Sequence, residues 1–180
     1  YNPANTYKLI FDGDFSASTP VNSDRTVAVV VAESYEIATK ADWQAFCNRV
    51  NDGQTAINAK LMNDVDLSEE ITMAGTIRNY NGTFDGQGHT LTVNWNSAFS
   101  LPLAPFAYVE NATIKNLHVK GQNEATGNSF LSGLIQNAYG TVTVSGCVSD
   151  VKITNGDKND TYCAAGMVLS ADHDAKITFN

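Results

Sequence analysis

The chain has 180 residues, 43% of them hydrophobic, which is enough to bury a core in one domain or in one domain with a short extension. Its net charge of −8, from 11 Lys and Arg against 19 Asp and Glu, repels phosphate backbones and anionic lipids, so we expect no nucleic-acid partner. No stretch approaches the roughly 18 apolar residues of a membrane span, so this segment has no predicted span.

The composition favours β structure. The chain contains 19 asparagines and 13 glycines, which suit tight turns, together with many Val and Thr residues, which suit strands. Three cysteines, Cys47, Cys147 and Cys163, lack metal-ligand spacing and lie among apolar neighbours. We interpret them as buried free thiols, with a Cys147–Cys163 disulfide as the alternative.

Residues 1–36 are predicted to form a separate N-terminal β segment. A strand from Tyr7 to Phe11, a turn at residues 12–14 and a strand from Thr26 to Ala32 follow one another, with a polar loop before the second strand.

One helix is predicted after this segment. The Thr39 hydroxyl and the Asp42 carboxylate have the spacing of a capping box, and Gly53 is suited to end the helix. The apolar residues between them lie on one helical face: Trp43, Phe46, Cys47 and Val50. A single helix ahead of a β array is expected to cap the first open edge of that array.

Beyond Gly53, three apolar patterns recur. The first consists of Val65 and Leu67, then Leu91 and Val93 after 26 residues, then Leu117 and Val119 after 26 more, with a looser echo at Cys147 and Ser149. The second consists of residues 105–107, 132–135 and 165–168, at offsets of 28 and 33, and the third of Ile114, Val144 and Ile177, at offsets of 30 and 33. These series predict a coil of short strands in which each turn covers the core of the last. An antiparallel sandwich is the competing architecture.

The residues also carry a family resemblance. The segment 35–46, the FDGQGHTL run at residues 84–91 and the segments 112–117 and 132–135 resemble the repeats of large Bacteroides-type surface proteins, related to GLUG-type repeats. Similar segments precede the peptidase in the immunoglobulin A1 proteases of Gram-positive bacteria. The resemblance covers residues 35–180, although the glycines are sparser than in strict GLUG repeats.

The resemblance implies an all-β fold with a helix-capped, right-handed parallel β-helix at residues 37–180. It also implies secretion or anchoring at the bacterial cell surface, and an adhesive or glycan-related role. Because the sequence stops at Asn180 just as another coil begins, we expect a truncated piece of a longer protein, and we expect a monomer.

Candidate catalytic groups are few. Asp85 and His89 flank a Gly-Gln-Gly run, which we interpret as a turn in which Gly86 and Gly88 adopt unusual φ angles rather than as an acid–base pair. His118 alternates with apolar neighbours and is predicted to point outward. The chain lacks the paired histidines and glutamate of zinc peptidases, which excludes that chemistry at the motif level.

Metal sites are similarly weak. Residues 172–174 read Asp-His-Asp, but three consecutive residues cannot all face one ion. Asp64 and Asp66 alternate along one strand and could join other oxygens around Ca²⁺, but a solvated acidic face is the favoured interpretation. We therefore predict no catalytic, cofactor or metal site.

Aromatic side chains could bind glycans by stacking. Trp95 shares the inward positions of Leu91 and Val93 and is predicted to be core. The freer candidates are Tyr80, Tyr108, Tyr139 and Tyr162. A non-catalytic module that binds a glycan or a surface protein, or acts as a spacer, is the expected function. The alternative is a polysaccharide lyase or glycosidase, which would need paired carboxylates or a carboxylate with a basic partner, whereas Arg78 is the only arginine of the repeats.

Overall fold

The computed structural model describes residues 7–10, 28–31, 34–98, 102–125, 130–155 and 163–180. The chain divides into two compact units, Tyr1–Glu33 and Ser34–Asn180. In the first unit, β1 (Tyr7–Ile10) and β2 (Ala28–Val31) lie within the two strands predicted for this segment, and they pair antiparallel. The predicted turn at residues 12–14 lies outside the described residues.

The second unit begins with β3 (Tyr35–Ile37), which pairs in parallel with a later strand and so belongs to this unit. Helix α1 (Lys40–Asn51) follows and confirms the predicted capping box. The Asp42 N–H donates to Thr39 Oγ1 at 3.2 Å, and the Thr39 N–H donates to Asp42 Oδ2 at 2.9 Å. Gly53, with φ +110°, follows the helix end.

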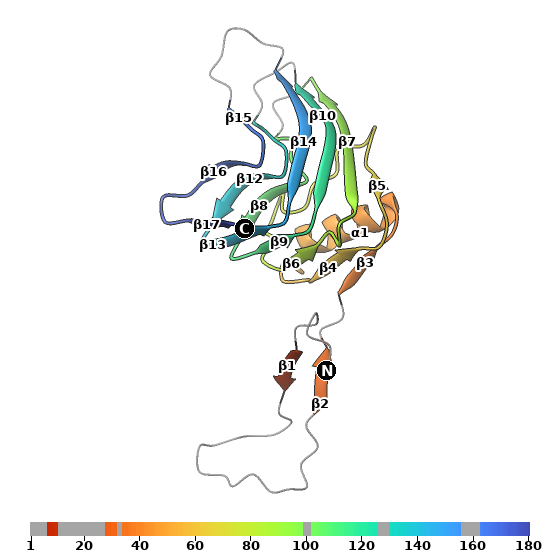
Figure 1. Ribbon diagram of the computed structural model, residues 1–180, viewed down its shortest axis with the longest axis vertical. Coiled ribbons are helices and arrows are strands. Elements are labelled where there is room, and N and C mark those ends of the chain that lie inside the picture. Colours follow the sequence, from red (N-terminus) through yellow and green to blue (C-terminus); the bar gives the residue numbers. More distant parts are fainter. Residues whose placement is uncertain (1–6, 11–27, 32–33, 99–101, 126–129, 156–162) are drawn as a thin grey trace, which may run out of the picture. The chain divides into compact units, whose positions relative to one another are not determined.

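The remaining strands are short and follow one another around a coil (Figure 1). In chain order they are β4 (Ala59–Leu61), β5 (Val65–Asp66), β6 (Thr83–Asp85), β7 (Thr90–Ser97), β8 (Phe106–Glu110), β9 (Thr113–Lys115), β10 (His118–Ala125), β11 (Leu131–Ser132), β12 (Ile135–Tyr139), β13 (Thr141–Ser145), β14 (Val148–Asn155), β15 (Ala164–Ala165), β16 (Val168–Ala171) and β17 (Lys176–Phe179).

Every strand pairing in this unit is parallel. One sheet has the order β17-β13-β9-β6-β4-β3, a second β14-β10-β7-β5, a third β16-β12-β8, and a two-stranded sheet joins β11 to β15. The strands β4, β6, β9 and β13 of the first sheet mark the starts of what we number the first to fourth coils. The second to fourth coils contribute a strand to each of the three large sheets. The predicted parallel β-helix is confirmed, and the antiparallel sandwich is wrong for this unit.

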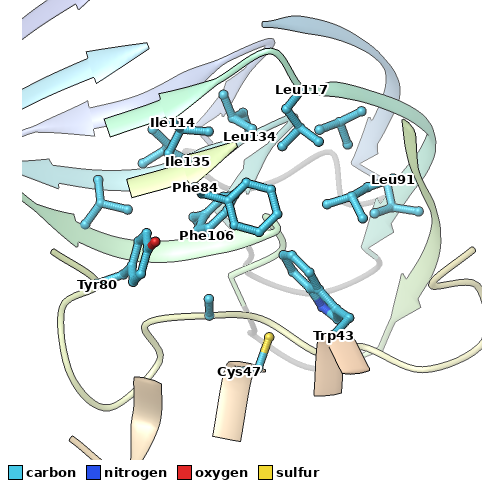
Figure 2. Close-up of a cluster of buried hydrophobic side chains, with 14 of the residues drawn as sticks. Trp43, Cys47, Tyr80, Phe84, Leu91, Phe106, Ile114, Leu117, Leu134 and Ile135 are labelled. Carbon is cyan, nitrogen blue, oxygen red and sulfur yellow. The ribbon is translucent and has the colours of Figure 1, made fainter. Parts of the chain in front are cut away.

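Helix α1 lies against the first coil and completes the core. The side chains of Trp43 and Phe46 are fully buried, and Figure 2 shows Trp43 directed from the helix toward Phe84 and Phe106. The ring centroids of Trp43 and Phe84 are 5.8 Å apart, and Trp43 Nε1 donates to the Thr72 carbonyl at 3.0 Å. The predicted packing of α1 onto the coils is thus confirmed, and it reaches rings of the second coil.

The 26-residue register is correct for one pair of coils and wrong for the next. Val65 pairs with Leu91, as predicted, but Leu91 pairs with Val119 rather than with Leu117. The interval has grown to 28 residues, because the connection between β7 and the next coil is longer. Leu117 is still buried, at the corner that precedes β10.

The other two series need smaller corrections. Phe106 pairs with Ile135, an offset of 29, and Ile135 pairs with Val168, an offset of 33. Ile114 pairs with Val144, as predicted, but Ile177 pairs with Val142. In each case the apolar residue faces the core, and the connection lengths between strands decide which residue it meets.

The three cysteines differ in burial, and the structure has all of them as free thiols. Cys47 is buried and Cys147 half-buried, and burial raises the pKa of both thiols. Cys163 is exposed, so its assignment to the core is wrong. It lies in the fourth coil, where no further described coil covers it.

Candidate functional site

The outer face of the β5–β7–β10–β14 sheet carries the polar residues that the sequence singles out. Strand alternation buries Leu91, Val93 and Trp95 and turns Asn94 and Asn96 to solvent. The Trp95 indole N–H donates to the Leu67 carbonyl at 2.9 Å inside the core. The prediction that Trp95 is a core residue is confirmed.

Asp64 links the first coil to the second on this face. Its Oδ1 accepts the Thr90 N–H at 2.8 Å and lies 3.4 Å from His89 Nδ1. The hydrogen bond from Thr90, helped by His89 and by the charge of Lys120, lowers the pKa of Asp64 below its ordinary value of 3.8. His89 therefore contacts Asp64 rather than Asp85.

Asp66, two residues after Asp64, also accepts hydrogen bonds. The Ser68 hydroxyl and the Ser68 N–H both donate to Asp66 Oδ1, the N–H at 2.9 Å. These bonds lower the pKa of Asp66, with help from the charges of Lys40 and Lys120. Both carboxylates of the calcium hypothesis thus already have hydrogen-bond donors. Among the residues that the structure describes, no group of three or more His, Cys, Asp or Glu side chains is arranged to hold a metal ion.

His118 points outward, as predicted, and lies 2.9 Å from Asp150 Oδ2 of the next coil. The third histidine, His173, lies between Asp172 and Asp174, with ring nitrogens 3.1 and 3.2 Å from their carboxylates. Each of these two histidines thus lies beside a carboxylate at hydrogen-bond distance.

Asp85 opens a turn, as the sequence predicts. Its Oδ1 accepts the Gln87 N–H at 2.9 Å and the Asn116 side-chain amide at 3.1 Å, and its Oδ2 lies 3.2 Å from Lys115 Nζ. Burial raises the pKa of Asp85, but these hydrogen bonds and the Lys115 charge outweigh it, and the net shift is downward.

The two glycines of this turn, Gly86 and Gly88, are required for different structural reasons. Gly88 has φ +81°, as predicted, and Gln87 before it has φ +50°. Gly86 is not in the left-handed region, which corrects that part of the prediction. A Cβ at Gly86 would lie 2.4 Å from the Asn116 carbonyl oxygen, so the close approach of the next coil requires the glycine.

A groove lies on a different side of the coils, over the outer face of the β8–β12–β16 sheet. Its volume is about 510 Å³, and its lining residues are Pro102, Tyr108, Phe130, Gln136, Asn137, Cys163, Leu169 and Ser170. These residues come from matching positions in three successive coils. Tyr108, Asn137 and Ser170 are register partners in β8, β12 and β16. The groove therefore crosses the second, third and fourth coils along the direction of stacking.

The other lining residues also come from matching positions in successive coils. Leu103 pairs with Leu131, and Leu131 with Ala164, which places the preceding residues, Pro102, Phe130 and Cys163, one above another. Gln136 and Leu169 likewise occupy equivalent positions beside the paired residues Ile135 and Val168. Each of the three coils thus gives the groove one residue at its corner and one or two from its strand.

Gln136 is the most unusual polar residue of the groove. It is only 5% exposed, and its Oε1 has no hydrogen-bond partner among the described residues. A buried carbonyl oxygen without a donor is costly, and native structures contain few of them. Gln136 is also a lining residue of the groove, so a molecule bound there would lie beside this side chain.

The four tyrosines that the sequence suggests as glycan-binding candidates differ in burial. Tyr80 is fully buried, with its hydroxyl donating to the Ile57 carbonyl at 3.0 Å, so its prediction as a free aromatic is wrong. Tyr108 and Tyr139 are half-buried, with ring centroids 6.5 Å apart, and Tyr108 lines the groove. Tyr162 lies outside the described residues.

The groove residues other than Tyr108 have no local sequence signal. Equivalent positions in successive coils are far apart in the sequence and unevenly spaced: Tyr108, Asn137 and Ser170 follow one another after 29 and 33 residues. Chemically, the groove combines aromatic and aliphatic surface with amide and hydroxyl groups, and Cys163 and Tyr108 are the ionisable side chains among its described lining residues.

Among the described residues, no helix is long and apolar enough to cross a membrane. Comparisons of the chain with protein-family models, with curated proteins and with solved structures find no match.

Proposed function

We propose that this protein is a non-catalytic binding module of an extracellular or cell-surface protein, with adhesion to a glycan or a host protein as its role. The observation that carries the proposal is the groove over β8, β12 and β16, which is lined both by aromatic rings and by Gln136, whose side-chain oxygen has no hydrogen-bond partner among the described residues. A concave apolar surface with a few placed polar groups is typical of a ligand site. The parallel coils supply a rigid support for it.

The chemistry of the groove favours binding without turnover. Glycosidases use two carboxyl groups that flank the scissile bond, and lyases need a base beside a charge-stabilising group. Within the described part of the chain, the lining contains no Asp, Glu, Lys, Arg or His. The thiol and the phenol that it does contain, Cys163 and Tyr108, lack a neighbouring base in the lining.

A polysaccharide-processing enzyme is the second candidate, and one observation favours it. His118 and Asp150 form a close histidine–carboxylate pair on the outer face of the β5–β7–β10–β14 sheet. Such a pair can move protons. It lies on a different sheet from the groove, so an enzyme using it would bind its substrate on the other face.

A glycan array and a panel of extracellular host proteins, each probed with the whole chain, test the binding function. A lyase and hydrolase screen on the same glycans tests the enzymatic alternative. We expect retention of a ligand with no change in its chain length. Cleavage that disappears in His118→Ala, with the fold intact, would establish the enzyme and overturn the binding module.

A further inference from the structure

Among the lining residues that the structure describes, none has a side chain that is fully charged at neutral pH, although the chain as a whole has a net charge of −8. An ionised ligand group placed there would lose its water without gaining a partner, which is unfavourable. Anionic ligands would in addition be repelled by the acidic protein. The lining therefore favours an uncharged ligand.

That ligand must also donate hydrogen bonds. Gln136 Oε1 is an acceptor at a residue that is 95% buried, and none of the described residues donates to it. A ligand hydroxyl or N–H placed at this atom would restore the hydrogen bond that water supplies in the unfolded chain. Asn137 and Ser170 add further polar groups along the groove.

The rest of the lining suits flat apolar surface. The Phe130 ring is 50% exposed, although aromatic rings of this size are normally covered, and Tyr108 is half-buried in the same groove. Aromatic rings contribute apolar contact area at little cost in conformational entropy. A sugar ring meets both requirements, because its C–H face is apolar and its rim carries hydroxyl donors.

A peptide fits less well. Peptide strands are usually captured by a free sheet edge, which supplies backbone hydrogen bonds. The groove instead lies across the face of the β8–β12–β16 sheet, where the backbone groups of β12 are paired on both sides. Over β12 only side chains are offered, and successive coils repeat them about every 4.8 Å along the stack.

We propose that this groove binds an uncharged saccharide chain that runs along the stacking direction of the coils. A sugar hydroxyl donates to Gln136 Oε1, and sugar faces rest on the Tyr108 and Phe130 rings. The assignment rests on the proposed binding function and deepens it by naming the ligand class and its orientation.

The test is isothermal titration of the whole chain with neutral gluco-, manno- and galacto-oligosaccharides and with oligogalacturonate. We expect at least one neutral series to bind, with an affinity that changes little between low and high salt, and oligogalacturonate to bind at least about tenfold more weakly. Affinity for the neutral series should rise with chain length until the ligand spans three coils.

Variants then locate the site. Gln136→Leu and Tyr108→Ala should each weaken binding about tenfold or more, whereas Tyr108→Phe keeps the ring and should stay within about threefold. Gln54→Leu, an exposed glutamine after α1, is the matched control and should leave binding unchanged. Thermal midpoints of all variants show that each is folded.

Three outcomes would overturn the assignment. Neutral saccharide binding that survives both Gln136→Leu and Tyr108→Ala would place the site elsewhere and leave the binding function standing. Preference for the uronate would show that the ligand class is wrong. If no saccharide binds but a host protein does, the occupant is a protein, while failure of every glycan and protein probe overturns the proposed function itself.

Discussion

Trp43 of α1 meets Phe106 of β8 edge-on, with ring centroids 5.8 Å apart and an interplanar angle of 81°. The two rings come from the helix and from the second coil, and both are fully buried. Phe84 and Tyr80 join the same cluster, with centroid distances of 5.1 and 5.8 Å to Phe106. The helix is therefore joined to the coils through an aromatic core.

Trp43→Ala should lower the free energy of unfolding by roughly 3 to 5 kcal/mol, because it leaves a cavity in this cluster and removes the bond to Thr72. Thermal or urea unfolding followed by circular dichroism measures the change. Ile77→Ala removes a side chain that is 73% exposed and should cost little. Equal effects of the two substitutions would mean that α1 is only an appendage.

Two equivalent glycines offer a matched test of the stacking. Gly133 and Gly166 precede paired strands of the third and fourth coils. A Cβ at Gly133 would lie 2.1 Å from the Gly166 carbonyl oxygen, whereas a Cβ at Gly166 would meet nothing within 4 Å. Gly133→Ala should therefore cost about 1 to 3 kcal/mol by overpacking.

Gly166→Ala should change stability by no more than about 1 kcal/mol, because it adds no contact and restricts only the unfolded chain. Urea unfolding of both variants gives the comparison. A cost at Gly166 as large as at Gly133 would show that a further chain segment covers the fourth coil in solution.

Stability should fall in acid partly through Asp64. Because its folded-state pKa is lowered from 3.8, its contribution is fully present above that value and is lost as the pH falls through the folded-state pKa. We expect the free energy of unfolding to decline more shallowly below pH 3.8 in Asp64→Asn than in the unmodified chain. Urea titrations at a series of acid pH values measure the slope. Parallel slopes would contradict the role given to the Thr90 and His89 contacts.

Asp85→Ala and His89→Ala should alter stability and leave any activity untouched. Asp85 accepts hydrogen bonds from Gln87 and Asn116, so its loss should cost about 1 to 3 kcal/mol. His89 makes one exposed contact with Asp64, so its loss should cost less than about 1 kcal/mol.

Urea unfolding and the glycan-cleavage screen are run together on these two variants. A cleavage activity that disappears in either variant, with its unfolding curve preserved, would revive the enzymatic alternative.

Local features could be predicted from the sequence in detail. The Thr39–Asp42 capping box and the apolar face of α1 depend on residues within a few positions of one another, so propensity and spacing specify them. Strand alternation likewise identified Trp95 as core and His118 as outward-facing.

Register between coils could be predicted only in part. Val65 and Leu91 match because the first interval is regular, but Leu91 meets Val119 because connections of different length follow. Apolar periodicity predicts that a residue faces inward, but it does not predict which residue of the next coil lies beside it. For the same reason Gln136 and Leu169 could not be grouped with Tyr108 before the pairing was known.

Because the groove is assembled from matching positions in consecutive coils, the ligand specificity that we propose for it would be divided among those coils. Tyr108, Asn137 and Ser170 form one such row, and each side chain meets only its immediate neighbours. In a stacked repeat, interactions between distant repeats are weak. A substitution in one coil should therefore change the ligand preference of a single subsite and leave the other subsites unchanged. Ligand preference can then change one coil at a time while the fold is kept.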